Sequence, residues 1–216
     1  MTTPRDEHPS NGDGRHARRA RGRAQVIDAM FDLINDGHTP LHIDQVAERA
    51  GISPASIYRY FGNLDEVQRH TLEHFTVRYA DLLGPPPPAD TTAERISSHV
   101  EHRVRLFTEA GSIMWLGRIR SHEHPRIAAG VRTVRGQLRE HTARHFAAEL
   151  ATCGDAESAL DAIETVTSPE AWNTLVTIFD RTTEAIALRW RNALWHLIDG
   201  TASHRPPSDW STDATT

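Results

Sequence analysis

The sequence contains no lysine, so all 24 basic residues are arginine, and 29 acidic residues give the chain a formal net charge of −5. A chain with this balance is not a general nucleic-acid coat, so any binding to DNA must depend on a local basic region. The only cysteine, Cys153, excludes an internal disulfide framework and is typical of a reducing compartment. We predict no role for this thiol.

Long apolar runs are also absent, and the arginine-rich N-terminus carries no hydrophobic segment. The sequence therefore predicts neither a membrane span nor a secretory signal, and we expect a cytoplasmic protein. Alternating strand patterns, internal repeats and glycine-rich phosphate loops are missing as well. Because the apolar residues recur at helical spacing instead, we predict an all-α protein of one or two domains.

Two short helical patterns joined by a tight turn occupy residues 43–61. Apolar residues recur at helical spacing over residues 43–50, and Gly51 then offers a stop that can adopt the left-handed conformation. The chain restarts at once, because Ser53 is a good N-cap and Pro54 suits the first helical position, where a backbone N–H is not needed. This arrangement predicts a helix-turn-helix.

The second of these helices has an outward face that suits a DNA groove. At about 100° per residue, Ile57 and Phe61 point to the core. On the outward face, Arg59 is expected at the edge of a guanine, and the hydroxyl groups are expected at bases or phosphates. In the alternative interpretation the tyrosines only pack and the arginine is a solvated charge. The predicted contacts in this stretch are Ser53, Pro54, Ala55, Ser56, Tyr58, Arg59 and Tyr60.

A basic run precedes the helix-turn-helix. Residues 15–23 hold five arginines and no acid, directly before the apolar positions of a helix that we place at residues 18–35. A solvated arm is the ordinary interpretation of such a run, but its position favours binding to phosphates or to an adjacent minor groove. The arginines expected to contact DNA are Arg18, Arg19, Arg21 and Arg23.

Composition also predicts the domain organisation. Asn63 and Glu66 have the spacing of a capping box, which starts a connecting helix. The prolines at 85–88 cannot continue a helix, so they mark a domain boundary. The expected segments are a disordered basic arm at 1–17, the DNA-binding domain with three helices at 18–62, the connecting helix at 63–84, a larger helical ligand-binding and dimerisation domain at 90–200, and a loose tail at 201–216.

The order of these N-terminal features resembles the DNA-binding domain of the TetR (tetracycline-repressor) family of bacterial transcriptional regulators. The resemblance rests on HIDQVAERAGISPASIYRYFGNLDEV and covers about residues 18–70. It implies that the second helix of the motif enters the major groove and that the first turn of the helix before it touches the DNA backbone. His42, a further predicted contact, stands where the family has a capping threonine, and Leu64 replaces a phosphate-binding lysine. Backbone binding is therefore expected to depend more on the N-terminal arginines.

The second half predicts further helices. Helical spacing covers residues 91–111, with Gly111 as the expected end, and a short apolar segment follows. A long helix is expected at 125–151. Ser168 and Pro169 either kink one helix that starts near Asp155 or cap a new one, and we favour the kinked helix. The last helix is placed at 182–199.

This half is expected to provide dimerisation and ligand binding. Two recognition helices about 34 Å apart are needed for a palindromic operator, which requires a homodimer. The resemblance implies an interface formed by the last two helices, although their tryptophans are alternatively core residues. The predicted interface residues are Trp172, Leu175, Val176, Trp190, Ala193, Leu194 and Leu197.

Charged residues in apolar stripes indicate a pocket for a polar ligand, or pair with one another. The predicted pocket residues are Arg103, Phe107, Met114, Trp115, Leu138, His141 and His145.

We therefore predict a ligand-responsive transcriptional regulator, a repressor rather than an activator, that binds a palindromic double-stranded operator and is released by a small-molecule effector. One alternative is a fold of this family that serves as a ligand or protein adaptor. A metal sensor is another, because pairs such as His70 and His74, or His141 and His145, share a helix face. An enzyme is disfavoured, since no nucleophile elbow or metal-hydrolase motif occurs. No cofactor, catalytic residue or metal ligand is assigned.

Overall fold

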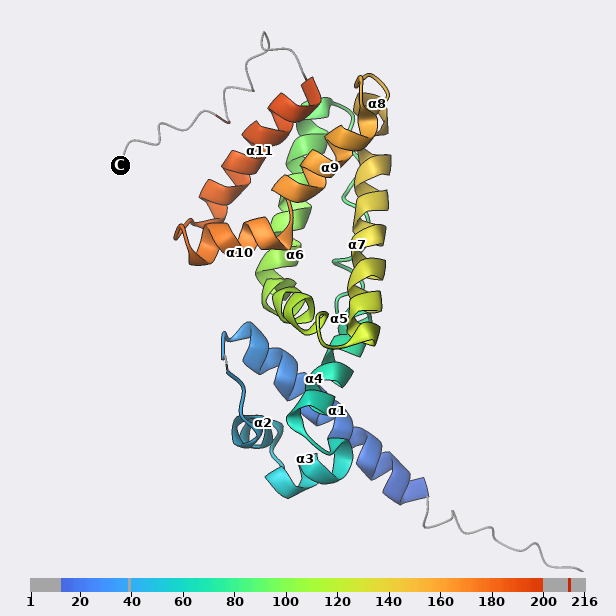
Figure 1. Ribbon diagram of the computed structural model, residues 1–216, viewed down its shortest axis with the longest axis vertical. Coiled ribbons are helices and arrows are strands. Elements are labelled where there is room, and N and C mark those ends of the chain that lie inside the picture. The colour runs from blue at the N-terminus through green and yellow to red at the C-terminus, as the bar shows by residue number, and fades with distance from the viewer. Residues whose placement is uncertain (1–12, 39, 200–209, 211–216) are drawn as a thin grey trace, which may run out of the picture. The chain divides into compact units, whose positions relative to one another are not determined.

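The computed structural model describes residues 13–38, 40–199 and 210, and within these ranges it contains α-helices and no strand (Figure 1). The expected all-α fold is confirmed for this part of the chain. The structure divides into two compact units, one that extends to His74 and one that starts at Phe75. Most of the expected arm and of the expected tail lies outside the described residues. No helix in the described ranges is long and apolar enough to cross a bilayer.

The N-terminal unit consists of four helices around one small core. The helices are α1 (Asp13–Asn35), α2 (Ile43–Ala50), α3 (Pro54–Phe61) and α4 (Leu64–Glu73). α1 begins at Asp13 rather than at the expected Arg18, so residues 13–17 are helical instead of part of a disordered arm. The core packing expected from the helical spacing is present, because the apolar positions of α1 are buried together with those of α2 and α3. The buried residues include Ile27, Phe31, Ile34, Val46, Ile57 and Phe61.

The expected connecting helix at 63–84 is interrupted at His74. The backbone N–H of His74 bonds to the carbonyl oxygens of His70 and Thr71 at 3.1 Å each, and its ring Nδ1 lies 2.8 Å from His70 O. These contacts end α4. The division between the units therefore lies at His74 and Phe75, before the proline segment that we expected to mark it.

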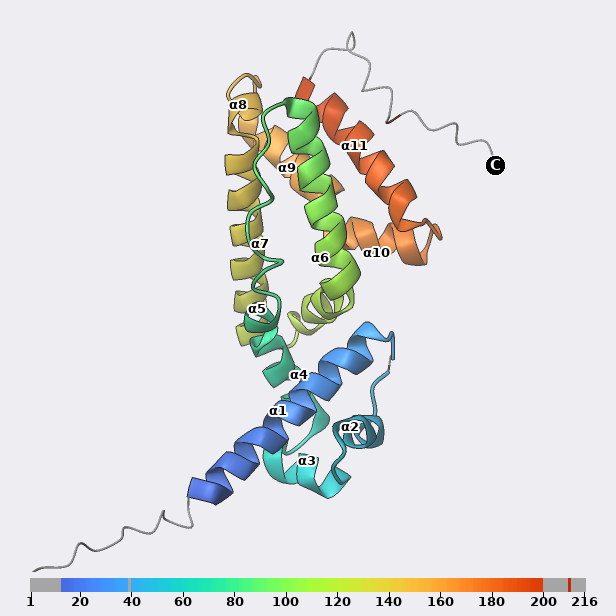
Figure 2. The same ribbon diagram turned by 180° about the vertical axis from the view of Figure 1, so that it is seen from behind.

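The C-terminal unit is built on two long helices, α6 (Thr92–Arg120) and α7 (Pro125–His145). After the short α5 (Phe75–Arg78), the chain runs between α6 and α7 to the start of α6 (Figure 2). The hydroxyl of Ser98 holds this segment by donating to Pro87 O at 2.7 Å. The other helices are α8 (Ala147–Leu150), α9 (Ala156–Val166), α10 (Pro169–Thr177) and α11 (Thr183–Asp199), and α10 and α11 pack on α6.

Three boundaries in this unit differ from the expected ones. α6 continues through Gly111, because a helix interior tolerates glycine at a modest cost and here the residue lies against a tryptophan. A Cβ at Gly111 would be 3.4 Å from Trp172 Nε1. The helix expected at 125–151 ends at His145, and α8 follows after Phe146.

The third difference concerns the element that we expected to be one kinked helix. α9 ends at Val166, and Ser168 then caps a new helix by accepting the backbone N–H of Ala171 at 3.0 Å. Pro169 follows at the first helical position, which is the position that favours proline. The prediction of a single kinked helix is therefore wrong.

Aromatic rings form the centre of the C-terminal unit. Phe107 of α6, Trp172 of α10 and Trp190 of α11 lie with ring centroids 6.0 to 6.2 Å apart. Trp172 and Trp190 are buried, and so is Leu194. These three residues were expected at a dimer interface, but they belong to the core of the single chain, because α10 and α11 need this apolar surface to pack on α6.

Candidate nucleic-acid interface

The turn between α2 and α3 has the local geometry that the sequence predicts. Gly51 adopts the left-handed conformation with φ 67°, where a side chain would be strained. Ser53 is the N-cap of α3 and accepts the backbone N–H of Ser56 at 3.3 Å, and Pro54 occupies the first turn. Ile57 and Phe61 are buried. The helix-turn-helix therefore holds α3 as a rigid element with one face turned to solvent.

The outward face of α3 is a connected polar surface. Ser53 Oγ lies 3.1 Å from Ser56 Oγ, and Arg59 Nη2 donates to Ser56 Oγ at 3.2 Å. The Arg59 guanidinium lies over the Tyr60 ring, 5.2 Å from its centroid. Ala55 and Tyr58 are exposed, with Tyr58 at 53%. These side chains present donors and acceptors at the spacing of one helix face, as contact with base edges requires.

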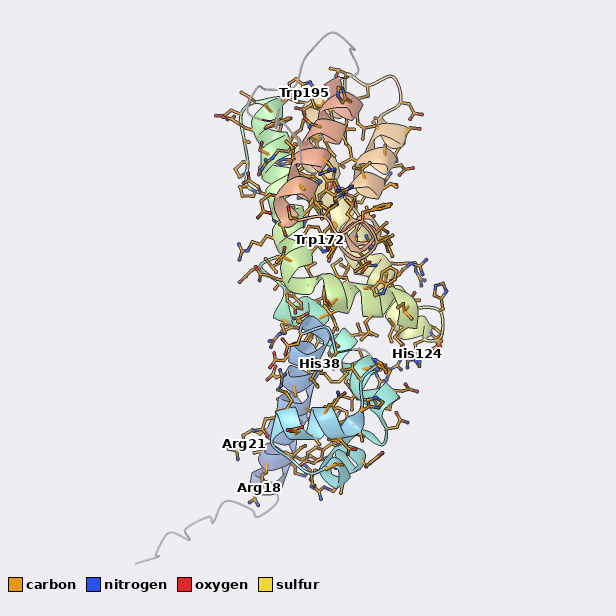
Figure 3. The ribbon with its side chains drawn as sticks, turned by 90° about the vertical axis from the view of Figure 1, so that its left-hand side faces the viewer. Arg18, Arg21, His38, His124, Trp172 and Trp195 are labelled. Carbon is orange, nitrogen blue, oxygen red and sulfur yellow. The ribbon has the colours of Figure 1, made fainter. Side chains whose placement is uncertain are left out.

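The arginines of α1 divide into two groups. Arg18, Arg19 and Arg21 are exposed, and Figure 3 shows Arg18 and Arg21 near the start of the described helix. Arg23 is half-buried and donates through Nη1 to Tyr60 O at 2.7 Å. We expected Arg23 to contact phosphate, but its guanidinium is occupied within the protein.

The two departures from the family pattern lie at helix starts. His42 is the N-cap of α2, and its backbone N–H donates to Gln45 Oε1 at 3.0 Å. Asn63 caps α4 by accepting the backbone N–H of Glu66 at 2.8 Å, and the half-buried Leu64 follows it. A leucine provides no cation for a phosphate at this position.

Residues 27–67 match the family model described as "Bacterial regulatory proteins, tetR family". These residues form a DNA-binding domain of the TetR-family type.

Curated TetR-family relatives include the HTH-type transcriptional regulators BetI of Brucella canis and Brucella suis. Each is 31% identical to this chain over 98 residues, which is 44% of this chain and 50% of the relative. The chain thus matches the curated relatives over about half of their length. The residues matched by the family model include the helix-turn-helix described above, so that match and the geometry agree.

Solved structures extend the likeness to the whole TetR-family fold. A transcriptional regulator from Rhodococcus sp. RHA1 has a TM-score of 0.66 at 15% identity, covering 85% of this chain and 99% of that chain. FadR from Bacillus subtilis, solved in complex with stearoyl-CoA, has a TM-score of 0.55 at 14% identity, covering 82% of this chain and 98% of that chain. At these identities the comparison shows a shared fold.

The predicted pocket residues differ in their surroundings. Arg103 is 3% exposed and donates to Glu164 Oε1 at 2.7 Å and to Thr142 Oγ1 at 2.9 Å. Phe107 belongs to the aromatic core, whereas Trp115 is 38% exposed and Met114 is half-buried. Arg103 and its partners form a buried ion pair instead of an open ligand site.

A groove of about 690 Å³ lies between α7, α9 and the start of α10, with one lining residue from α6. Glu164, the partner of Arg103, lines it. Arg135 donates to both carboxylate oxygens of Glu170 across the groove, at 2.6 and 2.7 Å. The other lining residues are Arg118, Val131, Gly136, Arg139, Asp161, Thr165 and Ser168.

Histidines of α6 and α7 meet in the interior of the C-terminal unit. The His99 Nε2–H donates to Thr167 Oγ1 at 3.3 Å, because that hydroxyl already donates to Ile163 O at 2.8 Å. His99 Nδ1 is then a buried acceptor without a hydrogen-bond partner among the described residues. His102 Nε2 and His141 Nδ1 are further buried ring nitrogens without such a partner there. His145 Nε2 lies 2.9 Å from Arg95 O.

Burial favours the neutral form of His99, His102 and His145. Desolvation lowers the pKa of His99 well below its ordinary value, and the charge of Arg103 lowers it further. Desolvation with the nearby Arg103 also lowers the pKa of His102 to about 4. The pKa of His145 is lowered chiefly by burial. Protonation of His99 or His102 would place a second positive charge near Arg103.

We expect the C-terminal unit to lose stability as the pH falls from 7.5 to about 5.5. The unfolded chain takes up a proton at each histidine near pH 6.5, whereas folded His99 stays neutral. The free energy of unfolding therefore falls by up to about 1.4 kcal/mol for each pH unit below that value. The stabilisation is fully present above about pH 6.5. Urea unfolding followed by tryptophan fluorescence measures it, because all five tryptophans belong to this unit. His102→Gln should flatten the dependence of the free energy of unfolding on pH. The control His122→Gln should keep the slope of the wild type.

Several histidines that could be considered as metal ligands lie beside arginine side chains instead. His122 Nε2 lies 2.7 Å from Arg118 Nη1, and His124 Nε2 lies 3.2 Å from Arg120 Nη2. His70 Nε2 faces two arginines. Among the described residues, no group of three His, Cys, Asp or Glu side chains is arranged to hold a metal ion.

Sequence reasoning missed two residues that shape the recognition surface, Gly22 and His70. Gly22 packs against the ring of Tyr60, and His70 binds Arg23. A glycine inside an arginine-rich helix was the available signal for the first. No local pattern marks the second, because its partner is 47 residues away in sequence.

Proposed function

We propose that the protein is a cytoplasmic, homodimeric transcriptional regulator that binds a palindromic DNA operator through α3 and acts as a repressor. The observation that carries the proposal is the solvent-exposed face of α3, on which Ser56, Arg59 and Tyr58 stand on a helix fixed by its caps and by a buried apolar side. The match to the TetR-family model supports the same function. The curated relatives are named as transcriptional regulators, which supports a non-catalytic role.

The proposed dimer surface is the apolar surface that the single chain leaves uncovered. Ile178 and Phe179, directly after α10, are 72% and 55% exposed, and Val176 is 38% exposed. Leu175, Ala193 and Leu197 are half-buried on α10 and α11. Exposed aliphatic and aromatic residues concentrated in one segment are typical of an interaction site. The proposed surface thus leaves out the buried tryptophans and consists of their exposed neighbours.

We place the effector in the groove lined by Glu164, Arg135 and Glu170. Most of its lining residues are charged or hydroxyl-bearing, which favours an effector with charged groups. Such a ligand changes operator affinity only if it binds the DNA-competent and released shapes with different affinities. In this proposal, occupancy of the groove disturbs the Arg103–Glu164 pair and thereby the link that this pair makes between α6 and α9.

Selection of duplexes from a random pool with the purified full-length protein tests the function. We expect enrichment of one palindrome with half-sites about one helical turn apart or more. The substitution Arg59→Ala should relax the preference at one base pair of each half-site, at a cost of about 1–3 kcal/mol. If no palindrome is enriched even at low salt, the adaptor alternative replaces the regulator.

A further inference from the structure

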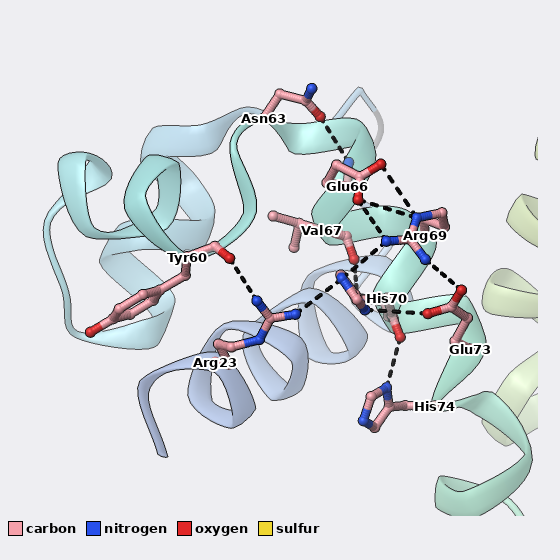
Figure 4. A network of polar contacts seen from close by, with 10 residues as sticks. Arg23, Tyr60, Asn63, Glu66, Val67, Arg69, His70, Glu73 and His74 are labelled. Atoms are coloured by element: carbon pink, nitrogen blue, oxygen red, sulfur yellow. Dashed lines mark hydrogen bonds and ion pairs between the residues drawn. The ribbon is translucent and has the colours of Figure 1, made fainter. Parts of the chain in front are cut away.

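The C-terminal end of α3 is held by a side chain from another helix. The last carbonyl groups of a helix have no partner within it and carry partial negative charge. Tyr60 O, one residue before the end of α3, accepts a hydrogen bond from Arg23 Nη1 of α1 at 2.7 Å (Figure 4). The Arg23 guanidinium carbon also lies 4.4 Å from the centroid of the Phe61 ring. One cation thus binds both the polar end and the apolar side of the helix.

The residue before this arginine leaves room for Tyr60. A Cβ on Gly22 would lie 2.7 Å from Tyr60 Cε2 and 2.9 Å from its hydroxyl oxygen, distances at which one of them must move. The tyrosine ring therefore lies directly on the backbone of α1. Since Arg59 lies over the same ring at 5.2 Å, the position of Tyr60 also affects the base-facing arginine.

Arg23 is itself held by α4. Its Nη2 donates to His70 Nε2 at 3.0 Å, and Arg69 Nη2 lies 3.1 Å from the same nitrogen. His70 Nδ1 lies 3.2 Å from Glu73 Oε2, so the ring donates to that carboxylate and accepts from the arginines. Arg69 in turn pairs with Glu66 at 2.6 Å and with Glu73 at 2.5 Å (Figure 4). The chain of contacts runs from α3 through α1 to α4.

We propose that Arg23 and Gly22 are positioning residues that fix the recognition helix on α1, and that Arg23 does not contact DNA. The proposal rests on the proposed DNA-binding function and adds the residues that set the orientation of the reader. The guanidinium is half-buried, and its two terminal nitrogens bind Tyr60 O and His70. Exposed Arg21 lies two positions earlier on the same helix and serves as the matched control for an arginine that is free to reach phosphate.

Two measurements on the full-length protein test this. Hydrogen exchange without DNA should be several-fold faster in α3 of Arg23→Ala than in the wild type, with α2 unchanged, because α3 is no longer held at its end. Operator affinity of the same variant should fall at least about tenfold, as for loss of a charged hydrogen bond. The slope of log affinity against log salt should stay at the wild-type value, whereas removal of a phosphate contact lowers it by about 0.9.

Three variants complete the test. Arg21→Ala should lower the salt slope and leave exchange in α3 unchanged. Gly22→Ala, which removes no charge, should weaken operator binding without changing the slope, because the Tyr60 ring must move. Arg23→Lys should restore part of the affinity, since an ammonium reaches one acceptor but does not reproduce the planar fork.

The outcomes separate this inference from the proposed function. A lower salt slope in Arg23→Ala, or unchanged exchange in α3, overturns the positioning role. A wild-type protein that binds no duplex overturns the proposed function alone, because exchange without DNA still decides what Arg23 does.

Discussion

Glu164→Ala should lower the free energy of unfolding of the C-terminal unit by about 3–5 kcal/mol, the cost of removing one partner from a buried ion pair. The guanidinium of Arg103 is 3% exposed and would keep only the hydroxyl of Thr142 and the carbonyl of Leu138 as acceptors. Neither neutralises its charge. Urea unfolding followed by tryptophan fluorescence reports on this unit alone, because residues 1–74 contain no tryptophan.

A neighbouring ion pair that also involves α9 is the control. Asp161 of α9 bonds Arg139 of α7, but its side chain is 69% exposed. Asp161→Ala should therefore cost less than about 1 kcal/mol, as is usual for solvated pairs. The double variant Arg103→Met with Glu164→Leu should recover most of the stability, since it leaves no unpaired charge in the core. Equal destabilisation in Glu164→Ala and Asp161→Ala would contradict the assignment of a buried pair.

Replacing Arg18, Arg19 and Arg21 together with alanine should weaken operator binding about a hundredfold near 0.15 M salt. Removal of each phosphate contact lowers the slope of log affinity against log salt by about 0.9, so the slope of the triple variant should be smaller in magnitude by between two and three units. The reason is that Leu64 supplies no cation at the start of α4, so we expect these three exposed side chains to supply the positive charge that binds the DNA phosphates. Fluorescence anisotropy titrations across a salt series measure both quantities.

Deletion of residues 1–20 provides a second form of this test, since it removes Arg5, Arg15, Arg18 and Arg19 but leaves Arg21. Its effect should have the same sign as that of the triple variant. An equal change of charge in the C-terminal unit, made at the exposed Arg126, Arg132 and Arg144 of α7, controls for net charge. Deletion that leaves both affinity and salt slope unchanged would show that the arm does not contact the operator.

The helix-turn-helix was predictable because its determinants are local. Gly51, Ser53 and Pro54 act on their own turn of chain, through a left-handed backbone, a cap and a fixed φ, and the structure has all three as expected. Local signals were also present at Ser168 and Pro169, but they fit both a kink and a cap. Only the packing of α9 and α10 distinguishes these two, which is why the sequence favoured the kinked helix wrongly.

A different cause explains why some side chains have roles other than the predicted ones. Arg23 belongs to an arginine run, and Trp172 and Trp190 lie on the last helices, so their sequence neighbours indicated DNA and a partner chain. In the structure Arg23 binds a carbonyl 37 residues away, and the tryptophans pack on Phe107. Helical spacing shows which residues share a face but not which other face covers them.

The sequence by itself determined the all-helical fold, the helix-turn-helix with its caps and the outward residues of the recognition helix, because each depends on backbone preferences within a few residues. The tertiary structure decided which cations face inwards and which aromatic rings are core. Arg103 and Arg23 are both arginines on apolar helices, yet one is paired with Glu164 and the other holds α3. Long-range packing makes that decision, since the cost of burying a charge depends on the partner that the fold brings to it.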